Sequence, residues 1–515
     1  MYSKVFSASL TGINAHIIEI ESHLDTGLPA FQVVGLPDTA IKEARERVIA
    51  SLKNSGIPFP NKKITVNLAP ANIKKEGSSF DMPIAIGLLS SMSLIPQESL
   101  NKIILLGELA LDGNLRPIYG ALAIALEAKK QGFEKILLPK ENAKEAALVE
   151  GIKAIPVQSL VEAINYLNES FAIEPEFVDV NELFKNSQVN HTLDFSDVKG
   201  QENVKRALEV AAAGGHNILM IGPPGSGKTM LAKRIITILP PLTMEESLET
   251  TKIHSIAGVL PKDQPLLTIR PFRSPHHTIS DAALVGGGMA RIKPGEISLA
   301  HHGMLFLDEL PEFARNVLEV LRQPLEDKKI TISRTKETIS YPANFMLVCS
   351  MNPCPCGHYG DPYHSCSCST TQIQRYIGKI SGPLLDRIDI HIEVPAVNYQ
   401  EISSKKTGES SEAIRKRVIK AREIQQDRFK NSKQTFKNAD MNTKQLRKYC
   451  ELDSASDDLL KLAMERLGLS ARAYDRILKV ARTIADLEDN EKITVVHISE
   501  AIQYRSLDRD YWNLH

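Results

Sequence analysis

This 515-residue sequence has no excess of either charge, no long apolar run and few cysteines. Its 62 Lys and Arg residues balance 62 Asp and Glu residues, so a polyanionic partner has to be attracted by local patches. No stretch approaches the roughly eighteen apolar residues of a membrane span, and the first twenty residues show no basic segment followed by an apolar core. Six cysteines are too few for a disulfide scaffold. The sequence therefore predicts a cytoplasmic protein that does not enter a membrane.

One eight-residue segment is a complete phosphate-binding loop. The apolar run at 218–221 predicts a buried strand before it, and apolar residues at helical spacing over 230–239 predict a helix after it. In this context the glycines turn backbone N–H groups toward phosphates, Lys228 reaches the outer phosphates, and Thr229 offers a hydroxyl to Mg²⁺. The chain is thus predicted to bind a nucleoside triphosphate through Gly222, Pro223, Pro224, Gly225, Ser226, Gly227, Lys228 and Thr229.

Two further strand-like runs end in residues suited to hydrolysis. The run 304–307 leads into Asp308 and Glu309, and the run 345–349 leads toward Asn352. Asp308 is predicted to hold Mg²⁺ through water and Glu309 to polarise the attacking water, while Asn352 orients that water.

Two arginines complete the predicted site. Arg387 lies in the segment 382–389, where a neighbouring subunit's nucleotide can use it more easily than its own. Arg472 lies at the start of an amphipathic helix with Ser470 as N-cap and is placed to contact the γ-phosphate. For either arginine a surface ion pair is the alternative interpretation.

These parts, in this order, resemble the AAA+ ATPases. The segments 270–277 and 295–309 are similar to the magnesium-chelatase-like branch, and nearly the whole chain is similar to the bacterial ComM/YifB family. The resemblance implies ATP and Mg²⁺ as ligands, a hexameric homo-oligomeric ring, and a helicase that drives branch migration on single-stranded and branched DNA in natural transformation.

The amino-terminal region mixes strand-like and helical runs and reads as an α/β unit. The segment 75–83 resembles the serine segment of Lon-type proteases, with Ser79 at the nucleophile position and Leu122 at the position of the catalytic lysine. Leucine cannot accept a proton, so the protease chemistry is predicted to be lost. The domain is expected to have a structural role, as a ring-forming or DNA-facing collar.

The chain divides into three predicted units and a linker. The fold class is α/β, with a Lon-protease-like (ribosomal S5 domain 2-like) domain, a central P-loop domain and a helical lid. The boundaries are 1–168 for the Lon-like domain, 169–193 for an acidic linker, 194–397 for the AAA+ core, and 398–515 for the lid.

The DNA-binding residues are predicted from basic side chains on loops. Asp308 follows Lys228 by 80 residues, which is longer than a strand-to-strand crossover requires, and by resemblance the extra length is a helix-2 insertion. A second candidate is the alternating stretch 328–336. Solvated loops are the alternative. The candidate residues are Arg270, Arg273, Arg291, Lys293 and Arg334.

Four cysteines form two close pairs, Cys354 with Cys356 and Cys366 with Cys368, separated by nine residues. Thiolates grouped in a reducing compartment favour zinc over a disulfide, although one intervening residue in each pair is tighter than usual. A structural zinc site and free thiols in a tight loop both remain open.

Three rival functions remain. The ATPase subunit of magnesium chelatase is one, although it is not expected to carry a Lon-like domain. An ATP-dependent protease is disfavoured by Leu122, and a non-catalytic DNA-binding scaffold is disfavoured by the intact Lys228, Asp308, Glu309 and Arg387.

Overall fold

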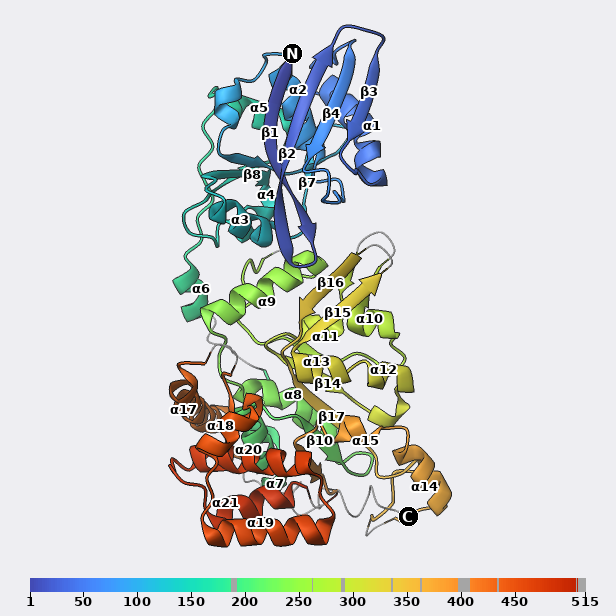
Figure 1. Ribbon diagram of the computed structural model, residues 1–515, viewed down its shortest axis with the longest axis vertical. Helices are drawn as coiled ribbons and strands as arrows, with labels where there is room; N and C mark the ends of the chain where they lie inside the picture. The colour runs from blue at the N-terminus through green and yellow to red at the C-terminus, as the bar shows by residue number, and fades with distance from the viewer. Residues whose placement is uncertain are drawn as a thin grey trace.

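The computed structural model describes residues 1–186, 192–261, 263–288, 292–334, 337–361, 364–396, 408–432, 435–505 and 507, without the side chains of residues 185, 186, 334 and 337. The amino-terminal domain lies at one end of the long axis, the nucleotide-binding core in the middle, and the carboxy-terminal helices at the other end (Figure 1). No helix in these described ranges is both long and apolar enough to cross a membrane.

The amino-terminal domain is a seven-stranded sheet with helices packed against it. Its strand order is β3-β4-β2-β1-β5-β8-β9, with β1 and β2 antiparallel and β5, β8 and β9 parallel. Helix α2 is buried along its whole length, in keeping with the apolar run 82–89 that makes up most of it. The elements are β1 (Tyr2–Thr11), β2 (Asn14–Asp25), β3 (Ala30–Val34), α1 (Thr39–Asn54), β4 (Lys63–Ala69), α2 (Asp81–Ser91), β5 (Ile103–Leu105), α3 (Ala121–Lys130), β8 (Lys135–Pro139), α4 (Lys140–Ala146), β9 (Lys153–Val157) and α5 (Leu160–Leu167).

The segment predicted as a linker is partly ordered against this domain. Glu176 N–H donates to the carbonyl of Ala154 at 2.8 Å, and the short helix α6 (Val180–Asn186) brings Val180 and Leu183 against the amino-terminal core. The apolar residues of this segment are few and show no sustained helical period, so the sequence pattern did not predict this helix.

The central domain is built on a five-stranded parallel sheet. The spatial order is β18-β10-β17-β14-β11, which is 5-1-4-3-2 when these strands are numbered along the chain. Four consecutive buried apolar residues in each of β10 and β14 fit strands covered on both faces. The strands are β10 (Ile218–Ile221), β11 (Phe272–Arg273), β14 (Met304–Leu307), β17 (Met346–Met351) and β18 (Ile390–Glu393).

The helices of the core pack around this sheet, and two hairpins project from it. Helix α8 follows β10 directly, and the antiparallel pairs β12 with β13 and β15 with β16 project from the chain between β11 and β17. The elements are α7 (Glu202–Gly214), α8 (Lys228–Ile238), α9 (Met244–Ala257), α10 (Asp281–Val285), β12 (Gly286–Gly287), β13 (Lys293–Pro294), α11 (Glu296–Leu299), α12 (Arg315–Glu319), α13 (Arg322–Asp327), β15 (Lys329–Arg334), β16 (Glu337–Pro342), α14 (Thr370–Ile377) and α15 (Gly382–Leu385).

One expectation about the core requires correction. Arg270 and Arg273 were expected in an inserted loop, but Phe272–Arg273 is the edge strand β11, paired in parallel with Met304 and Leu305 of β14. A two-residue strand is too short to show a β period, so sequence alone could not separate it from the loop. Between β11 and β14 the projecting hairpin is β12 with β13, which follows α10.

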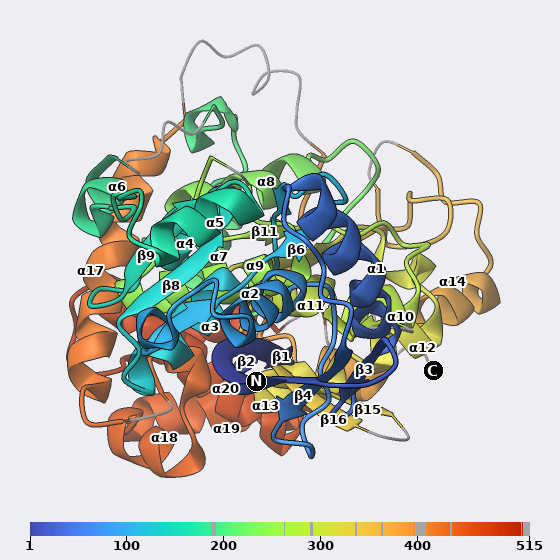
Figure 2. The same cartoon turned by 90° about the horizontal axis from the view of Figure 1, so that it is seen from above.

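The carboxy-terminal helices share one hydrophobic core with the central domain. Ile218 of β10, Leu231 of α8 and Ile484 of α20 are all fully buried in the same cluster. Seen from above, α17, α18 and α19 lie to one side of the molecule and α14 to the other (Figure 2). These helices are α17 (Ser411–Phe429), α18 (Thr443–Tyr449), α19 (Ser454–Leu467), α20 (Ala471–Leu487) and α21 (Val495–Gln503). Ser470 caps α20 by accepting from Ala473 N–H, as predicted.

Helix α9 joins the amino-terminal domain to the core (Figure 1). Ser255 of α9 accepts from Gly120 N–H at 2.9 Å and donates to the carboxylate of Glu145. Glu145 also accepts from Leu122 N–H at 2.7 Å, so one buried carboxylate serves both domains. Burial raises the pKa of Glu145 above its ordinary value. The two domains therefore meet through a buried hydrogen-bond network that lies within an apolar contact.

Candidate functional site

The phosphate-binding loop connects β10 to α8, as the sequence predicts. Gly227 is the N-cap of α8 with φ +89°, and Gly225 has φ +77°, a backbone region that glycine enters without steric cost. The loop therefore turns sharply at the carboxyl end of β10, which lies between β17 and β18 in the sheet. The backbone N–H groups at the amino terminus of α8 that lack a helical partner point toward this loop, and their positive partial charge favours the binding of a phosphate there.

The Lys228 side chain crosses back over the loop. Its Nζ donates to the carbonyls of Gly222 at 2.7 Å and Pro223 at 2.8 Å, and to Asn352 Oδ1 at 3.2 Å. Burial lowers the pKa of Lys228 from 10.5 to about 8, while the charges of Asp308 and Glu309 act in the opposite direction. The structure thus brings the predicted phosphate contact, Lys228, next to the predicted water-orienting residue, Asn352.

Asp308 and Thr229 are adjacent, as a shared Mg²⁺ site requires. Thr229 Oγ1 donates to Asp308 Oδ2 at 2.6 Å, and Ser350 Oγ donates to Asp308 Oδ1. A hydroxyl and a carboxylate are oxygen ligands of the kind that Mg²⁺ prefers, so this pair fits the ion. Sequence reasoning missed Ser350, although its place near the end of β17, two residues before Asn352, was a usable signal.

Glu309 lies at the edge of the same site with its side chain more than half exposed. Its backbone has φ +55°, a strained region for a residue with a side chain, and its N–H donates to Asp308 Oδ1 at 3.1 Å. His277 Nδ1 lies 3.6 Å from Glu309 Oε2. The histidine comes from the loop after β11, in the segment 270–277 that the sequence marked by its resemblance to the magnesium-chelatase-like branch. The site therefore contains a histidine beside the predicted catalytic carboxylate.

The two predicted arginines occupy different environments. Arg387 is only 6% exposed, and its guanidinium binds the carboxylate of Glu326 and the carbonyl of Pro383. Arg472 has a side chain that is 62% exposed, and its Nη1 lies 3.8 Å from a carboxylate oxygen of Asp386. In this conformation Arg387 is held by its own subunit, whereas Arg472 is accessible at the start of α20.

The predicted DNA-binding residues that the structure describes differ in their contacts. Arg270 donates to the carbonyls of Pro240 and His302 at 2.6 Å each, and pairs with Glu246 at 2.8 Å. The other residues differ in turn: Arg273 pairs with Glu296 through two hydrogen bonds, Lys293 is exposed with Nζ 5.5 Å from the Tyr119 ring centre, and Arg291 and the Arg334 side chain lie outside the described residues.

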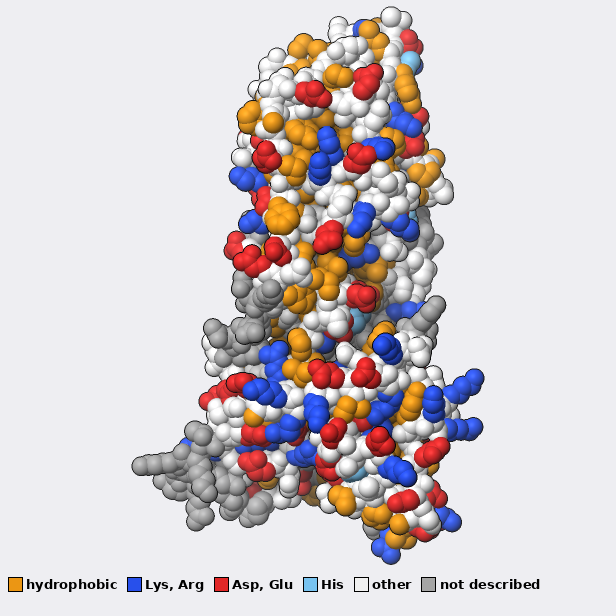
Figure 3. Space-filling model, turned by 90° about the vertical axis from the view of Figure 1, so that its left-hand side faces the viewer, with side chains coloured by type: hydrophobic (Ala, Val, Ile, Leu, Met, Phe, Trp, Pro, Cys, Tyr) orange, Lys and Arg blue, Asp and Glu red, His pale blue; other side chains and the backbone are white. Residues whose placement is uncertain are grey.

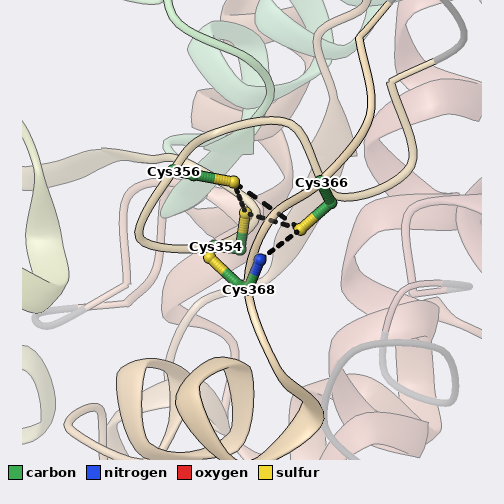
Figure 4. A group of neighbouring side chains, drawn as sticks. All are labelled: Cys354, Cys356, Cys366 and Cys368. Carbon is green, nitrogen blue, oxygen red and sulfur yellow. Dashed lines mark hydrogen bonds between the residues drawn. The ribbon is translucent and has the colours of Figure 1, made fainter.

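The four clustered cysteines meet in the loop between β17 and α14 (Figure 4). The structure places one ligand atom from each of them within 4.8 Å of all the others. None of them forms a disulfide.

The Lon-like domain has no lysine at the predicted dyad position. Leu122 is fully buried in α3, and Ser78, beside Ser79, donates to the carboxylate of Glu108. Lys75, a buried lysine of the serine segment, donates to the carbonyl of Pro70. A leucine side chain has no basic group, so this position cannot supply the base of a Ser-Lys dyad.

The sheet order 5-1-4-3-2, a phosphate loop directly after the first of these strands, β10, and a helical carboxy-terminal region define an AAA+-like P-loop domain. Models of three families match different parts of the chain: "Magnesium chelatase, subunit ChlI" over 194–402, "Subunit ChlI of Mg-chelatase" over 20–142, and "Magnesium chelatase, subunit ChlI C-terminal" over 408–505.

Full-length relatives narrow this class to one family. Protein YifB of Escherichia coli is 46% identical and competence protein ComM of Haemophilus influenzae is 44% identical, each over 98% of this chain and 97% of the relative. Lon protease 2 of Bacillus subtilis is 27% identical over 30% of this chain and 29% of its own length. The chain belongs to the YifB/ComM family of magnesium-chelatase-like AAA+ proteins.

Proposed function

We propose that this chain is an ATP-driven DNA motor that remodels branched recombination intermediates as a cytoplasmic hexameric ring. The observation that carries the proposal is the convergence of Lys228, Asn352, Asp308 and Thr229 at the carboxyl ends of β10, β14 and β17. A site of this kind binds and hydrolyses a nucleoside triphosphate. Its competence-protein relative supports DNA as the polymer on which the energy is used.

Each side chain has a role in the proposed hydrolysis. Lys228 binds the outer phosphates of ATP in place of the loop carbonyls that it now contacts. Thr229 and Asp308 would hold Mg²⁺, which neutralises charge on the phosphates when bound. Glu309 accepts a proton from the attacking water, and Asn352 fixes the orientation of that water. Ser350 positions Asp308 by donating to its other oxygen.

The ring accounts for the two arginines. In the proposed assembly Arg387 exchanges Glu326 for the γ-phosphate bound by the neighbouring subunit, and Arg472 contacts a γ-phosphate and senses its loss. An arginine supplied in trans stabilises the charge that develops on the transferred phosphoryl group. Glu326 is half exposed but the Arg387 side chain is buried, so the exchange requires Arg387 to move out to the surface.

The DNA contact is proposed to be local, since the chain has no net charge. The face in Figure 3 carries interspersed basic and acidic side chains. Exposed cations such as Lys293 on β13 and Lys329 on β15 are better candidates than Arg270 and Arg273, whose guanidinium groups are already paired with carboxylates. Removing the paired arginines would leave partly buried carboxylates without these partners, so their loss does not report on DNA alone.

The second candidate function is the ATPase of a magnesium-chelatase-like metal-insertion complex, and the three matching family models favour it. The deciding experiment measures ATP turnover with single-stranded, duplex and four-way-junction DNA, and separately with a porphyrin. DNA stimulation supports the motor. Stimulation by the porphyrin alone, with no binding of any DNA, would instead support metal insertion.

A variant pair locates the DNA contact. The change of Lys293 and Lys329 together to Ala should weaken junction binding and lower the slope of log affinity against log salt by roughly 1.8, as expected for two lost phosphate contacts on duplex DNA. The control is Lys461→Ala on α19, another exposed lysine. Equal slopes in the double variant and the control would place the DNA path elsewhere.

A further inference from the structure

The cysteine loop meets the geometric requirement for a tetrahedral metal. Its sulfur-to-sulfur distances are 3.3 Å for Cys354 to Cys356, 3.7 Å for Cys354 to Cys366 and 3.6 Å for Cys356 to Cys366. Four thiolates bonded to one Zn²⁺ at about 2.3 Å would lie about 3.8 Å apart, whereas a disulfide needs about 2.0 Å. The observed spacing of Cys354, Cys356 and Cys366 is therefore that of a metal ligand set, and the ligand atom of Cys368 lies within 4.8 Å of all three.

The surrounding groups leave the four sulfurs as the ligands. Cys354 is fully buried in the apolar cluster around β17, and Cys368 N–H donates to Cys366 Sγ at 3.4 Å (Figure 4). His358 and His364, in the same loop, each contact Asp361 at 3.1 Å through Nδ1. The two histidines are thus linked through Asp361 at the tip of the loop, and the four cysteines lie together at its base.

This loop touches the nucleotide site in two places. Cys354 follows Asn352, the partner of Lys228, by two residues. Gly357 follows Cys356 with φ +88°, and a Cβ built on it would lie 2.5 Å from Cδ and 2.6 Å from Cγ of Pro224 in the phosphate loop. A side chain at 357 could therefore be accommodated only by moving one loop away from the other.

We propose that Cys354, Cys356, Cys366 and Cys368 bind one structural Zn²⁺, and that the closed cysteine loop braces the phosphate-binding loop through the Gly357–Pro224 contact. Zinc fixes the base of the loop, because four bonds to one ion tie its first cysteine pair to its second. The brace restricts the phosphate loop to its nucleotide-binding conformation. The bracing part of this proposal rests on ATP binding at that loop.

The first test is metal analysis of protein purified without a histidine tag. We expect near one zinc per chain, lost in the double variant Cys354→Ser/Cys366→Ser and retained in Cys450→Ser, a buried cysteine of the lid. Zinc-free, folded protein that takes up none from a zinc-supplemented buffer would overturn the metal site.

The second test separates bracing from folding. Gly357→Ala keeps all four thiols, so it should retain zinc while binding Mg-ATP at least about tenfold more weakly, a loss of about 1.4 kcal/mol. Gly468→Ala is the matched control, because Gly468 has φ +62° and a Cβ added to it would meet nothing within 4 Å. Circular dichroism verifies that both variants are folded.

The outcomes for the two proposals can be distinguished. Parental protein that binds zinc but no nucleotide contradicts the proposed ATPase and the brace, but not the metal site. ATP binding that is equally tight in the parent and in Gly357→Ala, or before and after zinc removal, contradicts the brace and leaves the ATPase standing.

Discussion

The strongest quantitative prediction concerns the pH dependence of ATP binding. In the free protein, burial lowers the pKa of Lys228 to about 8. Phosphate favours the protonated amine, so at high pH the side chain must take up a proton before it can bind phosphate as a cation. Affinity for ATP should therefore be constant well below pH 8 and fall above it.

The size of the effect follows from linkage. At pH 9 about nine-tenths of the Lys228 amines are neutral when the pKa is about 8, so the dissociation constant should be about tenfold higher than at pH 7. Tenfold corresponds to about 1.4 kcal/mol. The free energy of unfolding depends on pH in the opposite direction. The pKa of Lys228 in the folded protein lies below the unfolded value of 10.5, so burial of the charged amine destabilises the folded protein below pH 8. This destabilisation is relieved between pH 8 and pH 10.5.

The assay is equilibrium titration with a fluorescent Mg-ATP analogue from pH 7 to pH 9.5. The comparison is Lys228→Arg, whose guanidinium stays protonated throughout, so its weaker binding should change little with pH. A parental affinity that is flat to pH 9.5, or an arginine variant as steep as the parent, would refute the reasoning from burial.

Three further predictions test the rest of the site. Lys228→Ala should abolish nucleotide binding, whereas Glu309→Gln should keep binding and stop turnover in a coupled ATPase assay; parental turnover in Glu309→Gln would place the base elsewhere. Arg387→Ala should lose ATPase alone and regain part of it when mixed with Lys228→Ala subunits, and no recovery in mixed rings that demonstrably form would contradict action in trans. Asp389→Asn should lower the free energy of unfolding by about 3–5 kcal/mol, because this fully buried carboxylate pairs with α20, while Asp489→Asn, in an exposed pair, should cost under about 1 kcal/mol; equal melting curves would contradict this ranking.

Local features could be predicted because their causes are adjacent in sequence. The strand at 218–221, the phosphate loop and the helix after it are confirmed as β10 and α8, since an apolar run, a glycine pattern and a helical period are all short-range signals. The same holds for the hairpin arm within 328–336, which is β15, and for the Ser470 cap. The family could also be identified from these motifs and their order, as the full-length relatives confirm.

The tertiary structure alone decided which distant residues meet. Ser350 binds Asp308 and His277 approaches Glu309 because parallel strands end at one edge of the sheet, and no local pattern specifies that proximity. The same reason explains β11, whose two residues become a strand only by pairing with β14.

The sequence by itself determined the chemical groups of this protein: a phosphate loop, two acids after a strand, arginines and four cysteines. The folded chain decided their states. Arg387 is held by Glu326, which lies 61 residues away in sequence, and Gly357 rests on Pro224 across more than a hundred residues. Such contacts depend on how elements pack against one another, and packing is set by the whole core rather than by any short segment.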